Sequence, residues 1–142
     1  MERSISNIEV SKYDGLTIPF DDNSVDTCLF VDVLHHTDDP LRVMQEAGRV
    51  ARKSIVIKDH LADGVLSGHI LRFMDWVGNE RHGVSLPYNY FKAHEWHAYF
   101  SELGWSVKNW KTDLGIYPFW CSWAFDRKLH FIAELRLPTT SD

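Results

Sequence analysis

The stretch 14-DGLTIPFDDNSVDTCLFVDVLHHTDDP-40 decides the fold of this chain. Within it, the run from Thr27 to Leu34 is short, apolar and rich in β-branched residues, and Asp32 alone interrupts it. An Asp-Asn-Ser turn sequence precedes the run. A run of this kind predicts a strand that is buried on both faces, which is typical of a parallel sheet.

The end of the same stretch predicts the start of a helix. Asp39 can accept backbone N–H groups as an N-cap, and Pro40 suits the first helical position because that position needs no donor. A strand, a polar turn and a capped helix form half of a βαβ unit. Because ligands of open α/β sheets bind beyond the carboxyl ends of the strands, Phe30 to His36 mark the predicted site.

Hydrophobic periodicity predicts the other elements of a single domain over residues 1–142. The further strands are expected at Ile5–Tyr13, Ser54–Lys58, Trp105–Lys111 and Leu129–Leu135. The helices are expected at Pro40–Arg52, Leu66–Val77 and Ala93–Leu103.

Composition argues against several classes of function. The chain has 142 residues, of which 44% are hydrophobic, and this is enough for one folded domain. The net charge of −5 argues against sequence-independent binding to nucleic acid, which needs concentrated Lys and Arg. Two cysteines make no disulfide framework, so we expect a reducing, cytoplasmic environment. No apolar run approaches the ~20 residues that span a bilayer, so we expect no membrane segment.

The motifs of this region resemble the middle part of the class I S-adenosylmethionine-dependent methyltransferases, and more closely their small-molecule "type 11" branch. The similar residues are Asp14-Gly15, Ile18-Pro19-Phe20, Asp22-Asn23-Ser24, Asp26, Val33-Leu34-His35-His36, Asp39-Pro40, Arg49-Val50-Ala51-Arg52-Lys53 and Val56-Ile57-Lys58-Asp59-His60. The resemblance implies a partial Rossmann-like α/β fold. Such a fold has a mostly parallel sheet, a C-terminal antiparallel strand and helices on both faces.

The resemblance also implies a cofactor, S-adenosylmethionine, and the residues that bind it. Asp14 and Gly15 are expected to hold its adenine. The backbone at Phe30 and Val31 is expected to receive its methionine ammonium, with His35 beside it. The local sequence of Asp14-Gly15 also fits an ordinary Asp-Gly turn.

The methyl acceptor is expected to be a small molecule. His60 is the candidate base, since an imidazole titrates near neutral pH and the adjacent Asp59 can fix its tautomer. The alternative is a rim histidine that only hydrogen-bonds to backbone. Tyr88, Tyr90 and Trp120 are the candidate substrate-binding residues, although the aromatic segment around Trp120 could instead cap the closing hairpin. The eight histidines show no recognised metal-ligand spacing, so no metal site is expected.

One signature of the family is absent from the sequence. The eight glycines form no G-x-G, so the chain lacks both the loop that closes on the methionine part of the cofactor and the acidic ribose partner that follows that loop. The chain is therefore expected to represent the C-terminal portion of the domain and to bind S-adenosylmethionine weakly. It is either the later half of an enzyme or a non-catalytic remnant that acts as a binding or dimerisation module. The expected protein partner is a second copy or a separate N-terminal half.

Overall fold

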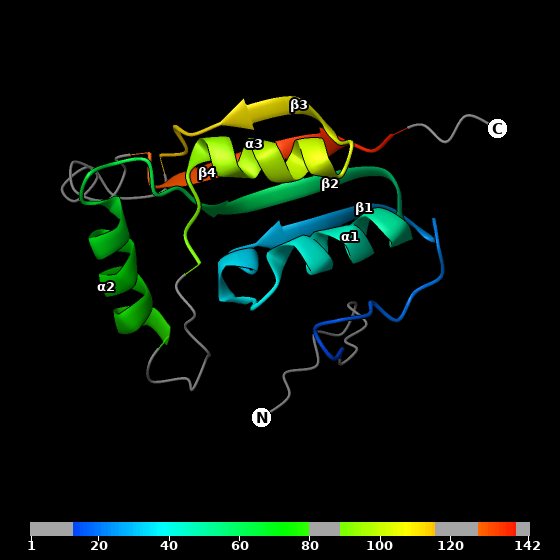
Figure 1. Ribbon diagram of the computed structural model, residues 1–142, viewed down its shortest axis with the longest axis horizontal. Coiled ribbons are helices and arrows are strands. Elements are labelled where there is room, and N and C mark those ends of the chain that lie inside the picture. The colour runs from blue at the N-terminus through cyan, green and yellow to red at the C-terminus, as the bar shows by residue number, and fades with distance from the viewer. Residues whose placement is uncertain (1–12, 80–88, 116–127, 139–142) are drawn as a thin grey trace.

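A four-stranded sheet lies at the centre of the computed structural model, which describes residues 13–79, 89–115 and 128–138 (Figure 1). In spatial order, the strands are β1 (Val25–Val31), β2 (Ala51–His60), β4 (His130–Arg136) and β3 (Ser106–Lys111). The described helices are the short 3-10 helix η1 (Leu34–His36) and the α-helices α1 (Pro40–Val50), α2 (Ser67–Asn79) and α3 (Ala93–Glu102).

The strand pairing confirms the predicted fold class. β1 and β2 are parallel, with Cys28 opposite Ile55 and Phe30 opposite Ile57. β4 lies between β2 and β3 and is antiparallel to both. β3 therefore points in the same direction as β1 and β2, and β4 is the one antiparallel strand of the described sheet. The strand predicted at Ile5–Tyr13 lies, apart from Tyr13, outside the described residues.

Helix α1 begins where the sequence predicts. The Asp39 carboxylate accepts a hydrogen bond from the backbone N–H of Arg42 at 3.0 Å, and Pro40 occupies the first turn. The apolar stripe of α1 is buried and consists of Val43, Met44, Ala47 and Val50. The helix ends before the predicted Arg52 because β2 already begins at Ala51.

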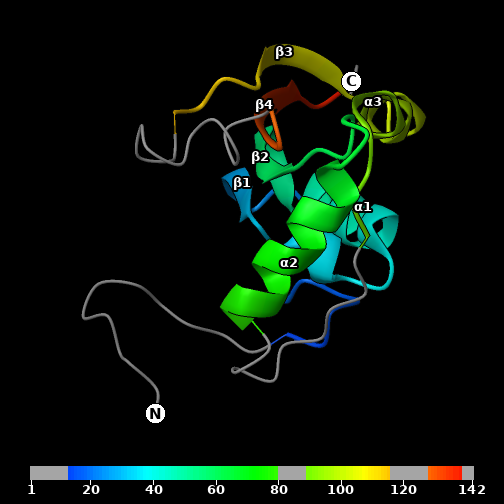
Figure 2. The ribbon, with the colours of Figure 1, turned by 90° about the vertical axis from the view of Figure 1, so that its left-hand side faces the viewer.

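One face of the sheet is open in the described part of the chain. Phe30 of β1 is buried, whereas Leu29 and Val31 on the other face of this strand are 65% and 51% exposed, so the prediction that β1 is buried on both faces is wrong. Helices α1 and α3 both lie on the face of Phe30 (Figure 2).

The direction of the crossover connections explains why both helices share a face. The connections from β1 to β2 and from β2 to β3 run the same way along the sheet. Right-handed crossovers that run in one direction place their helices on the same side. Helices for the opposite side, which the family resemblance implies, are not among the described elements.

Aromatic side chains fill the layer between the sheet and α3. Trp96 and Phe100 of α3 and Phe131 of β4 are each almost completely buried. The ring centroids of Trp96 and Phe131 are 5.1 Å apart, and Trp110 of β3 stacks on Phe131 at 4.3 Å. The indole N–H of Trp96 donates to the backbone carbonyl of His60 at 3.2 Å, which ties this core to the last residue of β2.

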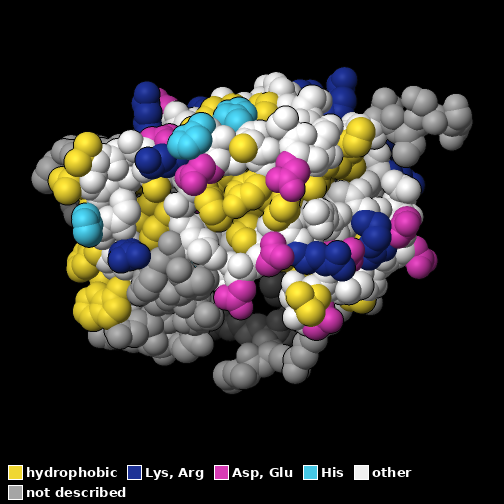
Figure 3. Space-filling view, viewed as in Figure 1, with side chains coloured by type: hydrophobic (Ala, Val, Ile, Leu, Met, Phe, Trp, Pro, Cys, Tyr) yellow, Lys and Arg dark blue, Asp and Glu magenta, His cyan; other side chains and the backbone are white. Residues whose placement is uncertain are grey.

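Helix α2 is covered less than the other α-helices. Leu71 is buried, but Phe73, Trp76 and Val77 are about half exposed, and Figure 3 shows apolar side chains on the surface in this part of the molecule. Within the described ranges, no helix combines the length and the hydrophobicity needed to cross a membrane.

Arg49, near the end of α1, anchors the segment that precedes β1. Its guanidinium donates hydrogen bonds to the backbone carbonyls of Ile18 and Phe20, both at 2.9 Å. It also forms ion pairs with Asp22 at 2.7 Å and with Glu46 at 2.9 Å. Glu46 in turn accepts a hydrogen bond from the backbone N–H of Ile18 at 3.0 Å. The Arg49–Glu46 pair therefore holds the Ile-Pro-Phe motif against α1.

Replacing Arg49 with alanine is expected to lower the free energy of unfolding by about 1–3 kcal/mol, because hydrogen bonds from a charged donor are lost at a partly buried site. Urea denaturation followed by circular dichroism measures this change. Arg42→Ala is the matched control, since it removes an exposed arginine from the same helix and should change stability by at most about 0.5 kcal/mol. Equal effects of the two substitutions would contradict the anchoring role of Arg49.

Candidate active site

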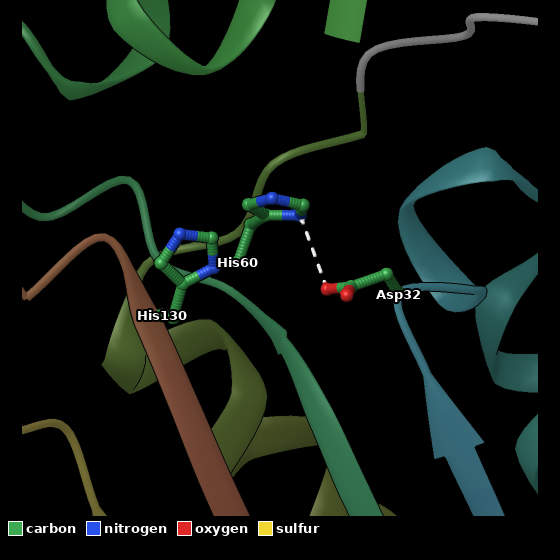
Figure 4. A group of neighbouring side chains, drawn as sticks. All are labelled: Asp32, His60 and His130. Carbon is green, nitrogen blue, oxygen red and sulfur yellow. Dashed lines mark ion pairs between the residues drawn. The ribbon is translucent and has the colours of Figure 1, made fainter. Parts of the chain in front are cut away.

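A group of polar side chains lies at the carboxyl ends of β1 and β2, the edge at which the sequence predicts the site. We call it the strand-end cluster. It consists of Asp32 after β1, His35 of η1, Lys58, Asp59 and His60 of β2, and His130 of β4. Figure 4 shows how Asp32, His60 and His130 approach one another from three separate segments of the chain.

Asp59 is the centre of the buried half of the strand-end cluster. Its side chain is fully buried, and its Oδ1 lies 2.6 Å from Nδ1 of His35, which is also buried. The same carboxylate accepts hydrogen bonds from the backbone N–H of Leu34 at 3.1 Å and of His60 at 2.7 Å. Asp59 therefore joins η1 to the end of β2.

Hydrogen bonds keep Asp59 charged inside the protein. Burial alone would raise the pKa of this carboxyl, but the hydrogen bonds from His35 and His60 outweigh burial and hold its pKa well below the ordinary value. Nδ1 of His60 lies 3.4 Å from Oδ1 of Asp59 and 3.2 Å from Nδ1 of His35. The structure thus brings the predicted pair Asp59 and His60 together, with His35 as the closer imidazole.

His60 connects the buried half of the cluster to the open half. It lies directly opposite His130 in the pairing of β2 with β4, and the centroids of the two rings are 4.7 Å apart. Burial lowers the pKa of His130 to about 4, and the nearby His60 and Lys58 act in the same direction. The imidazole of His130 is therefore neutral at pH 7.

Asp32 and Lys58 form the open half of the cluster. Nζ of Lys58 lies 2.6 Å from each carboxylate oxygen of Asp32, and the backbone N–H of Asp32 donates to the carbonyl of Lys58 at 2.9 Å. Asp32 has a positive φ of 52°, which aspartate adopts more readily than most residues. With 38% of its side chain exposed, Asp32 is the most accessible carboxylate of the cluster.

The residues expected to hold adenine form a turn of their own before β1. Oδ1 of Asp14 accepts hydrogen bonds from the backbone N–H groups of Leu16 at 2.8 Å and Thr17 at 2.9 Å. Gly15 has a φ of 83°, in the left-handed region that favours glycine. Both hydrogen bonds end on Oδ1 of an exposed side chain, so Oδ2 remains able to accept a hydrogen bond from a ligand.

The other residues expected near the cofactor lie at the end of β1 and behind it. Phe30 is buried in the core, while Val31 is exposed and is followed directly by Asp32. The ring of His35 is enclosed and hydrogen-bonded to Asp59. This placement favours a positioning role for His35 over direct contact with the cofactor.

Of the residues expected to bind the acceptor, Tyr90 lies beside the strand-end cluster. Its ring centroid is 5.9 Å from those of His35 and His60. Tyr90 also lines a cleft of about 290 Å³, together with Ala62, Val65, Gly68, His69 and Arg72. Tyr88 and Trp120 lie outside the described residues.

A larger cleft, of about 610 Å³, lies at the opposite end of the sheet and is lined in part by Arg52, Lys53 and Arg136. Arg52 and Lys53 are paired with Asp26 at 2.5 Å and 3.1 Å. Ligands of α/β sheets bind at the carboxyl ends of parallel strands, whereas this cleft lies at the start of β2. We therefore place the functional site at the strand-end cluster.

Lys58 and His130 were not predicted as site residues, and Asp32 was predicted only as part of the stretch from Phe30 to His36. Lys58 ends the predicted strand Ser54–Lys58 and Asp32 interrupts the predicted strand Thr27–Leu34, so their charge in two neighbouring apolar strands could have identified them. His130 is the second residue of the last predicted strand, Leu129–Leu135, so its position beside His60 follows only once the antiparallel register of that strand with β2 is known.

Comparison with known proteins agrees with the fold. Residues 2–57 match the family model described as a methyltransferase domain. None of the curated proteins matches the chain.

Several solved structures share the architecture. A Bacillus halodurans protein assigned to the methyltransferases is 16% identical over 93% of this chain and 78% of its own, with a TM-score of 0.60. A Haloferax volcanii protein assigned in the same way, solved with a methyltransferase activator, is 16% identical over 88% of this chain and 59% of its own, with a TM-score of 0.61. A SAM-dependent methyltransferase from Aquifex aeolicus is 20% identical over 93% of this chain and 56% of its own, with a TM-score of 0.60. At these identities the likeness establishes a shared fold.

Proposed function

We propose that this chain takes part in S-adenosylmethionine-dependent methyl transfer to a small-molecule acceptor, because it shares the fold of solved methyltransferases and its residues 2–57 match the methyltransferase domain model. The observation that carries the proposal is the position of the strand-end cluster. A hydrogen-bonded group of carboxylates and imidazoles lies at the carboxyl ends of β1 and β2, the edge of the sheet at which class I methyltransferases bind S-adenosylmethionine. A structural core alone has no need of charged groups at this edge.

The residues around β1 fit the cofactor. S-adenosylmethionine would supply a methyl group on a sulfonium, and the acceptor atom would attack the methyl carbon in line as the thioether leaves. The backbone at Phe30 and Val31 would receive the ammonium group, and Oδ2 of Asp14 would accept from the adenine amino group. Gly15 gives the chain the turn that brings the backbone to the edge of the ring. The work of the protein is mainly to align the two reactants and exclude water.

The residues at the end of β2 fit the acceptor. His60 would face the acceptor atom. The carboxylate of Asp59 would hold His60 in place, because it accepts a hydrogen bond from the backbone N–H of His60 and also contacts His35, whose ring lies against that of His60. Tyr90 would cover the acceptor, because its ring already lies against the two imidazoles. A small, partly apolar acceptor matches the size of the adjacent cleft of about 290 Å³.

A binding or dimerisation module is the second candidate function. The open face of the sheet supports it, because Leu29 and Val31 expose apolar surface on β1, an edge strand of the described sheet. The Haloferax volcanii neighbour was solved with an activator protein, which supports a partner-bound form here as well. The partner of this chain would be a second copy or a protein that supplies a glycine-rich loop.

Cofactor binding separates the two functions. Calorimetric titration is expected to give a dissociation constant for S-adenosylmethionine of about 100 µM or weaker, since losing two or three charge-assisted hydrogen bonds weakens a micromolar site at least about a hundredfold. Asp14→Ala should weaken binding further, while Asp21→Ala, an exposed control, should not. Micromolar binding that Asp14→Ala removes would show that this chain holds the cofactor unaided. If S-adenosylmethionine does not bind at several millimolar, only the function as a binding or dimerisation module remains.

Methyl transfer itself is tested with labelled S-adenosylmethionine at millimolar concentration and a panel of small hydroxyl and amine acceptors. His60→Ala should reduce transfer about a hundredfold or more, because misplacement of the acceptor by even a small distance costs that much. His94→Ala, which removes an exposed histidine from α3, should have no effect. Transfer that is equal in both variants would contradict the placement of the acceptor at His60.

A further inference from the structure

We propose that Asp32, His60 and His130 form a binding site for a divalent transition metal ion, with Zn²⁺ as the probe of choice. Each of the three side chains offers one ligand atom, and these atoms lie within 4.8 Å of one another (Figure 4). The site is not visible in the sequence, because its members come from the turn after β1, the end of β2 and the start of β4.

The donor set suits such an ion. Two imidazoles and one carboxylate form an open three-ligand site, which leaves at least one coordination position for a further ligand. Bonds of about 2.0–2.2 Å in a tetrahedral site require ligand atoms about 3.3 Å apart. The three candidate ligand atoms lie within 4.8 Å of one another, so closing the site needs a movement of up to roughly 1.5 Å.

The fold shows which ligand can make this movement. His60 and His130 are buried partners in the β2–β4 ladder and hold each other in place. Asp32 is the exposed member and lies in the turn after β1. The side chain of Asp32 can therefore rotate toward an ion that is bound by the two imidazoles.

Lys58 competes with a bound metal ion for the carboxylate of Asp32. Its ammonium contacts both carboxylate oxygens at 2.6 Å, so an ion can share this carboxylate only if Lys58 gives up one oxygen. The repulsion between the two cations then weakens the site. Lys58 thus sets the affinity, and removing its charge should make the ion bind more tightly.

A second group of possible ligands, His35, Asp59 and His60, is a less suitable site. All three are buried, and the short contact of 2.6 Å between His35 and Asp59 already satisfies the groups that would have to bind an ion. Asp59 and His35 contact Nδ1 of His60 at 3.4 Å and 3.2 Å, so the ion would bind His60 through Nε2 while Asp59 supports the ring at Nδ1, as carboxylates commonly support metal-binding histidines.

The role of the ion rests on the proposed function. It would lie at the same edge of the sheet as the expected acceptor and bind the oxygen or nitrogen of that acceptor at its open position. A bound hydroxyl loses its proton to solvent more readily, because a cation lowers its pKa. In this arrangement His60 acts through the ion as a ligand.

Metal binding is tested on the whole chain in the absence of S-adenosylmethionine and of any acceptor. Competition with a chromophoric chelator is expected to show one tightly bound Zn²⁺ per chain, and Co²⁺ should give the visible absorption of a site with nitrogen ligands. Asp32→Asn should weaken binding about a hundredfold, and Lys58→Met should tighten it about tenfold. His94→Ala, which breaks up the exposed pair His94 and His97 on α3, is the control and should change nothing.

Asp32→Asn keeps the test decisive, because Asp32 is only partly buried and its replacement preserves side-chain volume. Circular dichroism verifies that each variant is folded. Equal Zn²⁺ affinity in the parent chain, Asp32→Asn and Lys58→Met would overturn the proposal, and so would loss of binding in His94→Ala alone. Since no cofactor is present, a failure of methyl transfer has no bearing on this result.

Discussion

Trp96→Ala is expected to lower the free energy of unfolding by about 3–5 kcal/mol, the usual cost of removing a packed aromatic side chain. Trp96 is fully buried between α3 and β4, and its ring centroid lies 5.3 Å from that of Phe91 and 5.1 Å from that of Phe131. The substitution also removes the donor to the backbone carbonyl of His60, so this buried acceptor loses its partner as well. Urea denaturation followed by far-ultraviolet circular dichroism measures the loss.

Trp76→Ala is the matched control for this prediction. The side chain of Trp76 is of the same type, but 49% of it is exposed on α2. Its removal should cost no more than about 1 kcal/mol. If both variants lost the same amount of stability, the aromatic layer under α3 would not be the main core of the molecule.

Asp59→Ala is expected to cost about 3–5 kcal/mol as well, for a different reason. The carboxylate is buried and accepts hydrogen bonds from His35 and from the backbone N–H groups of Leu34 and His60. Removing it leaves these buried donors without an acceptor, and breaking a buried charged pair has a cost of this size. Asp59→Asn retains one oxygen acceptor, so its loss should be smaller, at about 1–3 kcal/mol.

Asp21→Ala is the control here, since it removes an exposed aspartate ahead of β1 and should change stability by at most about 0.5 kcal/mol. The order Asp59→Ala, then Asp59→Asn, then Asp21→Ala separates a hydrogen-bonding role from a simple change of net charge. A larger loss in Asp59→Asn than in Asp59→Ala would contradict the network as described.

The sequence was sufficient to predict the elements that depend on local chemistry. The capping of α1 by Asp39 follows from residue type and spacing, and the parallel pairing of β1 with β2 follows from an apolar run before a capped helix. The exposure of Leu29 and Val31 was not predictable in this way. It depends on which side of the sheet each crossover helix takes, which is a property of the whole topology.

The candidate site was also predictable only in part, because some of its contacts depend on local sequence and others on the topology of the sheet. Asp59 and His60 were identified because they directly follow the predicted strand Ser54–Lys58 at the expected edge. The hydrogen bond between Asp59 and His35 could not be predicted from the sequence, because it depends on the conformation of η1. The approach of His130 to His60 depends on the register of two strands that are far apart in sequence.

The position of β4 has a consequence for how the protein is made. β3 ends at Lys111 and is bonded, within the described sheet, to β4 alone, which begins at His130. During synthesis on a ribosome, β1 and β2 can pair early, but β3 must wait for residues translated later. Until then the nascent chain exposes the unpaired edge of β2, the situation in which chains engage chaperones or aggregate. His130 reaches its place beside His60 in the same late step, so the strand-end cluster is completed only when the sheet is.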